Sequence, residues 1–407
     1  MLDPTAQRTV VKAEAIAGLK AIDPAEWDRL AIPGWRLEAG GRPVAIDTAP
    51  KPYNPFVTHE FLKTLEDAGC VGGRTGWRPT HVIVRDAAGS AIGAAPVYQK
   101  VHSQGEYVFD YGWADAFERA GGRYYPKLQV SVPFTPAQGP RLLVGDADEA
   151  VRREVVARTL AALSAELGTS SVHVTFLEEA DAKTFEAEDF LIRTDTQFHF
   201  ENRGYDTPDD FLAALASRKR KQIKRERRDA LANGITIVWK TGDDITEADW
   251  DAFYAFYMDT GARKWGRPYL NRKFFSLLGE RMRHSVCLIF AERDGRTIAG
   301  ALNMIGSETL FGRYWGCSED HPFLHFEVCY YQAIDFAISR GLKRVEAGAQ
   351  GQHKLARGYE ASTTRSAHHI AHPGLRRAIA DYLEEERAAV QHQNAALNTY
   401  APYKKGS

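Results

Sequence analysis

The chain has 407 residues, which is long for one folding unit, so we expect at least two domains. Its 52 basic and 53 acidic side chains give a net charge of -1, so whole-chain charge gives no basis for binding nucleic acid or an anionic membrane. No apolar run approaches the roughly 18 residues needed to span a bilayer, and no secretory leader is recognisable. The four cysteines form no CxxC pair and are too few for a disulfide framework, so we expect reduced thiols and a cytoplasmic location.

The first 50 residues are expected to form an arm or linker, because the stretch 21–47 is rich in Pro and Gly after one short helical piece around Trp27. A series of alternating strands and helices follows in the first half. Its expected elements are, in chain order, a helix opened by Asn54 and Pro55 and closed by Gly69, strands at 80–85 and 91–100 around a turn, an insertion at 101–130, a helix that ends at Gly168 and a strand at 171–177.

The second half repeats this order. Its expected elements are strands at 286–291 and 297–305 around a turn, a helix that ends at Gly341 and a strand at 343–347. Because the same order occurs twice, we predict the α/β (α+β) fold class, with a tandem duplication of mixed-sheet domains at 51–200 and 201–407. A C-terminal helix at 375–397 is expected to end the second domain.

A helical region at 208–232, for which Thr207 is a suitable N-cap, opens the second domain. Between Arg218 and Arg228 it carries eight basic residues and one acidic residue. This run is either a solvated helix face, anchored on its other side by Ile223, or a binding surface for the phosphates of tRNA, a nucleotide-linked sugar or coenzyme A. Its candidate phosphate-binding residues are Arg218, Lys219, Arg220 and Lys221.

The densest group of reactive side chains follows the last predicted strand. Gly348 and Gly351 allow another molecule to approach the backbone closely. Lys354 and Arg357 can polarise a carbonyl or hold a phosphate. The residues that can take a proton from an amine nucleophile are Glu346, Glu327, His325 and His353. A tight turn between strands with solvated charges explains the same segment equally well.

The histidine spacing does not support a metal site. His321 and His325 are four residues apart, but Pro322 confines both to a helix start, and no Cys pair or H-E-x-x-H pattern accompanies them. We therefore expect no metal. No P-loop, no G-x-G-x-x-G after a strand and no nucleophile elbow occurs, so no bound cofactor is expected.

Eight motifs occur in the order found in a known family. They are the sequences NPFVTHEFL at 54–62, HSQGEYVFDYGWA at 102–114, YYPKL at 124–128, VPFTP at 132–136, RKRK at 218–221, GRYWG at 312–316, LHFE at 324–327 and GAQGQHK at 348–354. Together they make the chain resemble the FemAB-like predicted N-acyltransferases of the GNAT superfamily, relatives of the peptidoglycan aminoacyltransferases. The resemblance spans about residues 54–383.

This resemblance implies two GNAT-like domains in tandem, in which splayed central strands accept a thioester or ester acyl donor. The better-studied relatives move amino acids from aminoacyl-tRNA onto the peptide of peptidoglycan precursors. A lysine in their second domain looks equivalent to Lys354, which makes Lys354 a candidate for polarising the reacting carbonyl. The candidate substrate-binding residues are Asp110, Lys127, Tyr314, Trp315, Gln350, Arg357 and Tyr359.

The expected function is transfer of an acyl or aminoacyl group to the amine of a small molecule or peptide. The Q/R-x-x-G-x-G/A turn that binds pyrophosphate in coenzyme-A-dependent GNAT enzymes is not found ahead of either helix. Its absence argues against ordinary acetyl-CoA and, with the basic run, favours aminoacyl-tRNA or an unusual donor, while acyl-CoA stays an alternative co-substrate. The alternative interpretation is a non-catalytic ligand-binding or tRNA-binding protein with the same duplicated fold.

Overall fold

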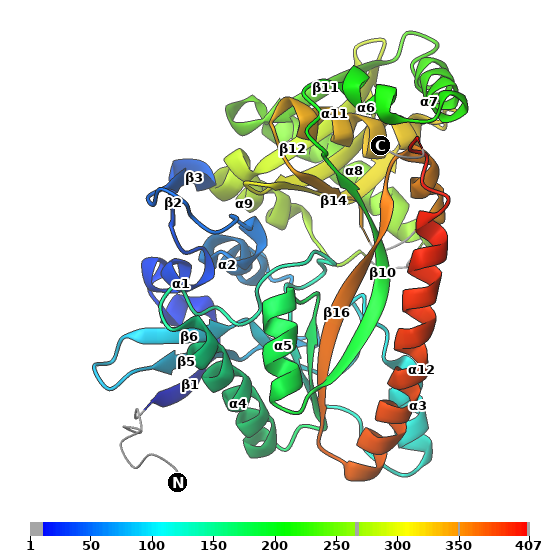
Figure 1. Ribbon diagram of the computed structural model, residues 1–407. Helices are drawn as coiled ribbons and strands as arrows, with labels where there is room; N and C mark the ends of the chain where they lie inside the picture. The colour runs from blue at the N-terminus through cyan, green and yellow to red at the C-terminus, as the bar shows by residue number, and fades with distance from the viewer. Residues whose placement is uncertain (1–10, 265–267, 349–350, 405–407) are drawn as a thin grey trace.

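The computed structural model describes residues 11–264, 268–348 and 351–404, and its centre is a mixed sheet of 11 strands (Figure 1). In spatial order the strands are β11 (Thr236–Thr241), β12 (Val286–Arg293), β13 (Arg296–Ile305), β14 (Thr309–Cys317), β15 (Arg344–Glu346), β10 (Leu191–Glu201), β16 (Glu360–Ile370), β9 (Ser171–Thr175), β8 (Lys127–Val130), β7 (Val97–Lys100) and β4 (Trp77–Pro79). Two small sheets accompany it, formed by β1 (Lys12–Ile16), β5 (His81–Arg85) and β6 (Ala91–Ala95), and by β2 (Trp35–Glu38) and β3 (Arg42–Ala45).

Each half of the chain contains a parallel strand pair joined by a helix. β8 and β9 are parallel and α4 (Glu149–Leu167) lies between them in sequence, while β14 and β15 are parallel with α11 (Gln332–Ser339) between them. The predicted tandem of mixed-sheet units is therefore confirmed. One detail is wrong, because β8 lies inside the expected insertion at 101–130. All four residues of β8 are buried, so the strand lacks the alternation by which sequence reveals a half-exposed strand.

The two halves exchange their final strands. β10, at the end of the first half, pairs with β15, and β16, near the end of the second half, pairs with β9. β10 and β16 pair with each other in antiparallel register from Leu191–His368 to His199–Glu360 and cross the middle of the molecule (Figure 1). The boundary that we expect near residue 200 therefore falls within β10, and the sheet runs through both halves without interruption.

The expected N-terminal arm is folded against the first half. Residues 12–50 contain β1, α1 (Pro24–Ala31), β2 and β3, and Leu19 and Trp27 are fully buried. The Pro and Gly content misleads because Asp23 caps α1, accepting from the backbone N–H groups of Ala25 and Glu26, and Pro24 occupies the first helical position. The arm prediction is therefore wrong for the described residues.

The helical region expected at 208–232 consists of two helices, α6 (Pro208–Ala214) and α7 (Ser217–Ala230). Thr207 caps α6 in a reciprocal capping box with Asp210. At the break between the helices, Leu215 forms a β-bridge with Tyr403 from the C-terminal segment. Sequence periodicity does not reveal this break, because its cause is a contact with a distant part of the chain.

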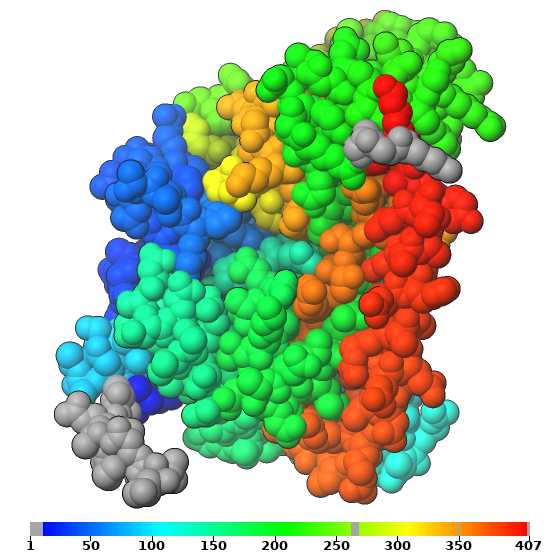
Figure 2. Space-filling model, in the orientation of Figure 1, coloured from blue at the N-terminus to red at the C-terminus, as the bar shows by residue number. Residues whose placement is uncertain are grey.

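Helices cover both faces of the sheet. α4 and α5 (Glu179–Ala187) pack on the first half, and α12 (Pro373–Asn398) runs along β10 and β16. α12 matches the predicted C-terminal helix and forms a long ridge on the surface (red in Figure 2). The other helices are α2 (His59–Asp67), α3 (Tyr111–Arg119), α8 (Glu247–Lys264), α9 (Arg272–Met282) and the short α10 (Leu324–Phe326). Within the described ranges, no helix combines the length and apolar character needed to cross a membrane.

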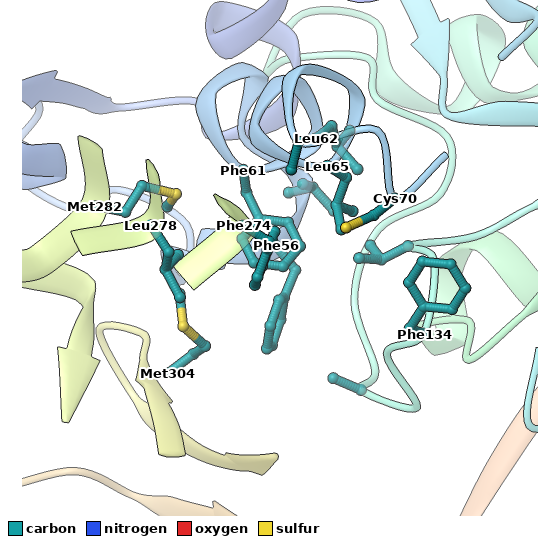
Figure 3. Close-up of a cluster of buried hydrophobic side chains, with 14 of the residues drawn as sticks. Phe56, Phe61, Leu62, Leu65, Cys70, Phe134, Phe274, Leu278, Met282 and Met304 are labelled. Carbon is teal, nitrogen blue, oxygen red and sulfur yellow. The ribbon is translucent and has the colours of Figure 1, made fainter. Parts of the chain in front are cut away.

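One hydrophobic core joins the two halves (Figure 3). Phe61 on α2 of the first half meets Phe274 on α9 of the second half edge to face, with ring centroids 6.1 Å apart. Phe56 makes a similar contact with Phe311 on β14 at 5.1 Å. Since these aromatic contacts bridge the halves, we expect them to unfold together.

Truncation of a bridging ring tests this shared core. Phe274→Ala removes a side chain that is 2% exposed and should lower the free energy of unfolding by about 3–5 kcal/mol. Urea unfolding followed by fluorescence should still show one transition. The matched control is Tyr400→Ala, whose side chain is 73% exposed and whose loss should change stability by less than about 0.5 kcal/mol. Two separate transitions in the Phe274 variant would show that the halves fold independently.

Candidate active site

The parallel strands β14 and β15 part in the second half. They pair only over Thr309–Phe311 and Arg344–Glu346, after which β15 ends and β14 continues to Cys317 beside β13. β14 also bulges at this point, since Gly312 and Tyr314 face consecutive residues of β13 and Arg313 is left without a register partner. We use the word gap for this point, where the pairing register of β14 and β15 ends.

Lys354 lies beside this gap, on the 3-10 helix η7 (Gln352–Arg357) that follows β15. Its ammonium donates to the carbonyls of Ala347 (2.6 Å) and Gly348 (3.1 Å). The side chain is buried, and burial lowers the pKa of Lys354 to about 8. Within the described ranges Lys354 forms no ion pair with a carboxylate, and two backbone carbonyls hold its ammonium.

The basic helix α7 holds η7 in place. Glu226, the one acid in the basic run, is buried and accepts from Tyr331 Oη (2.6 Å) and Arg357 Nη2 (2.9 Å). The next residue, Arg227, forms a two-point ion pair with Glu327, the first residue of the π-helix η6 (Glu327–Tyr331). One face of α7 thus fixes the two segments around Lys354. Both charges in each pair are hydrogen-bonded, which is the condition under which buried ion pairs are tolerated.

The C-terminal segment closes the other end of η7. Tyr403 Oη donates to the carbonyl of Gly358, at 2.6 Å, directly after η7. Tyr403 is also the residue that bridges Leu215 between α6 and α7. This one residue therefore ties the basic helix and the Lys354 segment together.

Aromatic rings gather on one side of Lys354. The ring of His325 lies 5.2 Å from Trp315 and 5.3 Å from Tyr330 between centroids, and His353 Nε2 is 2.9 Å from Tyr330 Oη. Partial burial, and then the charges of Lys354 and Arg357, lower the pKa of His353, which is neutral at pH 7 as a result. We name Trp315, His325, Phe326, Tyr330 and His353 the aromatic patch.

Glu346 lies at the end of β15, level with His199 on β10. It is 4% exposed, and burial raises its pKa to about 7, so it can both accept and release a proton near neutral pH. Its Oε2 accepts from the backbone N–H of Gln138, at 3.3 Å, which belongs to the first half. Burial, followed by the charges of Arg344 and Lys354, lowers the pKa of His199 to about 3, so the field of Lys354 reaches this side of the strand.

The structure brings several predicted site residues together and separates others. Lys354, His353 and Arg357 lie together on η7, and the ring of His325 contacts Trp315 and His353. Glu346 ends β15, the strand that precedes η7. Glu327 is committed to Arg227 and Gln332, so it is not placed as a base. Tyr359 is fully buried and donates to the carbonyl of Tyr330, so it supports the site without facing a ligand.

Three further predictions have different outcomes. Tyr314 points to the other face of β14 from Trp315 and donates to the carbonyl of Phe134 in the first half. Gln350 lies outside the described residues. Arg218 and Lys221 are exposed on α7, whereas Lys219 and Arg220 are half-buried.

Asp110 and Lys127 lie in a closed cluster of the first half. Lys127 Nζ, fully buried, contacts Asp110 Oδ2 and Glu106 Oε2, the latter at 2.7 Å, and these charges raise the pKa of Lys127. His173 on β9 lies beside Asp110 and pairs with His368 on β16, which in turn pairs with Leu191 on β10. Leu191 is eight residues along β10 from His199, the residue that pairs with Glu346. That separation is about 27 Å at about 3.4 Å per residue. Asp110 and Lys127 are therefore not placed to bind a substrate at Lys354.

Sequence reasoning missed Glu226, Tyr330 and Gln138. Glu226 carried a signal, because an acid inside a basic run and three residues after Ile223 falls on the buried helix face. The contact of Gln138 had no local signal, since it depends on the exchange of β10 and β16. Among the described residues, no group of three or more His, Cys, Asp and Glu is arranged to hold a metal ion.

Two mixed-sheet units in tandem, with a parallel strand pair that parts beside a buried lysine, define a tandem GNAT-like protein. The sequence model of the FemAB-like family, described as peptidoglycan biosynthesis or recognition, matches residues 18–405, and the chain belongs to this family. No curated protein matches the chain in sequence.

One solved structure, that of FemX, shows the same fold at low sequence identity. The crystal structure of FemX is 12% identical, with a TM-score of 0.52 over 88% of this chain and 98% of that chain. A tandem GNAT protein from the clavulanic acid biosynthesis pathway is 13% identical, with a TM-score of 0.43 over 89% of this chain and 99% of that chain. The similarity to FemX extends through both halves and agrees with the tandem architecture.

The lowered pKa of Lys354 has a consequence for stability. An unfolded chain, with the ordinary lysine pKa of 10.5, binds more protons than the folded protein between about pH 8 and about pH 10, so the lysine makes the free energy of unfolding rise with pH in this window. Relative to Lys354→Met, which cannot titrate, the wild type should gain about 2–3 kcal/mol between about pH 7.5 and about pH 10. Urea unfolding of both proteins measures the difference, and a difference that does not change with pH would show that the ammonium is solvated.

Proposed function

We propose that the chain transfers an acyl or aminoacyl group from an activated ester or thioester to an amine. The observation that carries this proposal is the buried ammonium of Lys354, held by two backbone carbonyls where β14 and β15 part. A preorganised cation in a water-poor site stabilises the negative charge that develops on a carbonyl oxygen during acyl transfer. Membership of a family linked to peptidoglycan biosynthesis or recognition agrees with such chemistry.

In the proposed reaction the amine nitrogen attacks the carbonyl carbon of the donor. A C–N bond forms, the C–O or C–S bond to the carrier breaks, and Lys354 donates a hydrogen bond to the carbonyl oxygen throughout. Glu346 takes the proton that the amine loses, and the departing carrier oxygen or sulfur takes up a proton. Glu346 fits this role because it directly precedes Ala347, whose carbonyl binds Lys354, and because its pKa lies near 7.

Aminoacyl-tRNA is the donor that the surroundings favour. The outer face of α7 presents Arg218, Lys221 and Arg225 to solvent, and its inner face holds η7, so phosphates bound outside would lie beside the site. The aromatic patch supplies rings on which the terminal bases of an RNA can stack. By contrast, the turn before the helix that starts at Leu324 lacks the glycine-rich sequence that binds a coenzyme A pyrophosphate.

The acceptor we propose is an amine on a cell-wall peptide or a similar small molecule, in keeping with the family. A protein that only binds tRNA is the second candidate, and the basic face of α7 supports it. Binding of tRNA without any product from an offered amine would favour that second function.

Substitution of Lys354 should stop transfer. Lys354→Met should lower kcat by about 100-fold or more, the cost of losing one oxyanion donor, while Lys183→Met, on an exposed lysine of α5, should have no effect. The assay offers bulk aminoacyl-tRNA or acetyl-CoA with an amine-bearing muramyl peptide and detects product by mass spectrometry. Wild-type turnover should fall below about pH 7 as Glu346 protonates and above about pH 8 as Lys354 deprotonates. Full turnover of Lys354→Met would show that the lysine is not catalytic.

The basic face of α7 should govern donor binding. The triple variant in which Arg218, Lys221 and Arg225 are all replaced by Gln should bind tRNA with a higher Kd. The slope of its log affinity against log salt concentration should be smaller in magnitude by up to about 0.7–0.9 for each lost phosphate contact. The control is Lys183→Gln, which also removes an exposed cation but far along the chain from α7. Equal salt slopes in all three proteins would exclude this face as a phosphate-binding surface.

A further inference from the structure

A loop from the first half touches both sides of the gap between β14 and β15. The backbone carbonyl of Phe134 accepts from Arg313 Nη2 and from Tyr314 Oη (3.1 Å), both on the bulged part of β14. Four residues later, the backbone N–H of Gln138 donates to Glu346 at the end of β15. The segment from Phe134 to Gln138 therefore contacts both β14 and the end of β15.

The loop is itself held firmly. The carbonyl of Pro136 accepts from Gln197 Nε2 (2.9 Å) on β10, and the carbonyl of Ala137 accepts from Arg141 Nη2 (2.8 Å). The ring of Phe134 stacks on Tyr269, with centroids 4.8 Å apart and planes 9° from parallel. The residues of the loop from Pro133 to Ala137 are buried.

The buried lysine cluster of the first half controls where Phe134 lies. The N–H of Phe134 donates to the carbonyl of Gly105, at 3.2 Å. Lys127 binds Ser103 Oγ (2.8 Å) and Glu106 Oε2 (2.7 Å), on either side of Gly105. Lys100, also fully buried, donates to the carbonyl of Gln104, at 2.9 Å. Charge-assisted hydrogen bonds in a buried setting thus hold the backbone segment whose Gly105 carbonyl binds the N–H of Phe134.

We propose that the loop Phe134–Gln138 is a positioning element of the acyl-transfer site, and that the Lys100–Lys127 cluster sets its position through Gly105. The loop keeps the β14 bulge and Glu346 at the separation that the reaction needs. The sequence predicts that Lys127 binds substrate. In this proposal Lys127 instead positions the loop, through Gly105, and does not contact the reacting atoms. The catalytic part of this inference rests on the proposed function.

Two glycines of the inserted segment provide a matched test. An added Cβ at Gly105 (φ +80°) would lie 2.7 Å from the ring of Phe134, whereas one at Gly121 (φ +82°) would meet nothing within 4 Å. Gly105→Ala and Gly121→Ala therefore carry the same backbone strain, and only the first displaces Phe134. Tyr314→Phe is a milder variant that removes one of the two bonds to the Phe134 carbonyl, in case Gly105→Ala does not fold.

Hydrogen exchange read by mass spectrometry tests the mechanical link without any substrate. Gly105→Ala should increase exchange in peptides that cover 312–316 and 344–348, and Gly121→Ala should leave both at wild-type rates. If Gly105→Ala folds and its exchange at 312–316 and 344–348 is unchanged, the proposal is overturned. If Gly105→Ala does not fold, unchanged exchange of these peptides in Tyr314→Phe overturns it.

Turnover tests the catalytic part with the same bulk aminoacyl-tRNA, or acetyl-CoA, and muramyl peptide. Gly105→Ala should lower kcat by about 10- to 100-fold with little change in the KM for the donor, since small misplacements of reacting groups cost this much; Tyr314→Phe should show the same split with a smaller loss. Increased exchange with wild-type kcat would overturn the positioning role. Increased exchange in a protein whose wild type forms no product would sustain the mechanical link and count against the proposed function instead.

Discussion

The antiparallel pairing of β10 with β16 is the constraint on which the molecule depends. Because each half lends its last strand to the other, the parallel pairs β8–β9 and β14–β15 run in opposite directions and their ends both point to the middle of the β10–β16 ribbon. The loop after β8 is thereby brought to Glu346 at the end of β15. A site assembled in this way belongs to neither half alone. The common aromatic core around Phe61 and Phe274 stabilises the same arrangement.

The duplicated units have diverged at the ends of their equivalent strands. After β15 the chain forms a glycine-bounded 3-10 helix that carries Lys354, whereas after β9 it enters α5 directly. In the first unit the buried lysines instead belong to the Lys100–Lys127 cluster, where each lysine has carboxylate or carbonyl partners. The second unit leaves Lys354 with carbonyl partners and a lowered pKa. Both copies thus bury lysines, but those of the first copy lie beside carboxylates, whereas the described partners of the Lys354 ammonium are backbone carbonyls.

Local signals in the sequence predict much of the fold and part of the site. The capping residue Thr207 locates the start of α6, because a helix cap depends on residues within a few positions of each other. The glycines that flank Lys354 mark a real conformational need, since Gly351 and Gly358 both have positive φ. Strand partners could not be predicted, because β10 and β16 are far apart in sequence and carry no local mark of their exchange. For the same reason the sequence does not reveal that Asp110 and Lys127, expected to bind substrate, lie in a buried cluster of the first half.

Tyr403 has a practical consequence for anyone who handles this protein. Its hydroxyl bonds the carbonyl that ends the Lys354 helix, and its backbone bridges the junction that leads into the basic helix. Residues 401–404 are therefore a strap that joins the junction of α6 and α7 to the end of η7. An affinity tag or fusion partner joined directly after residue 404 would pull on that strap, so purification handles belong at the opposite terminus, where β1 lies at the edge of a separate small sheet.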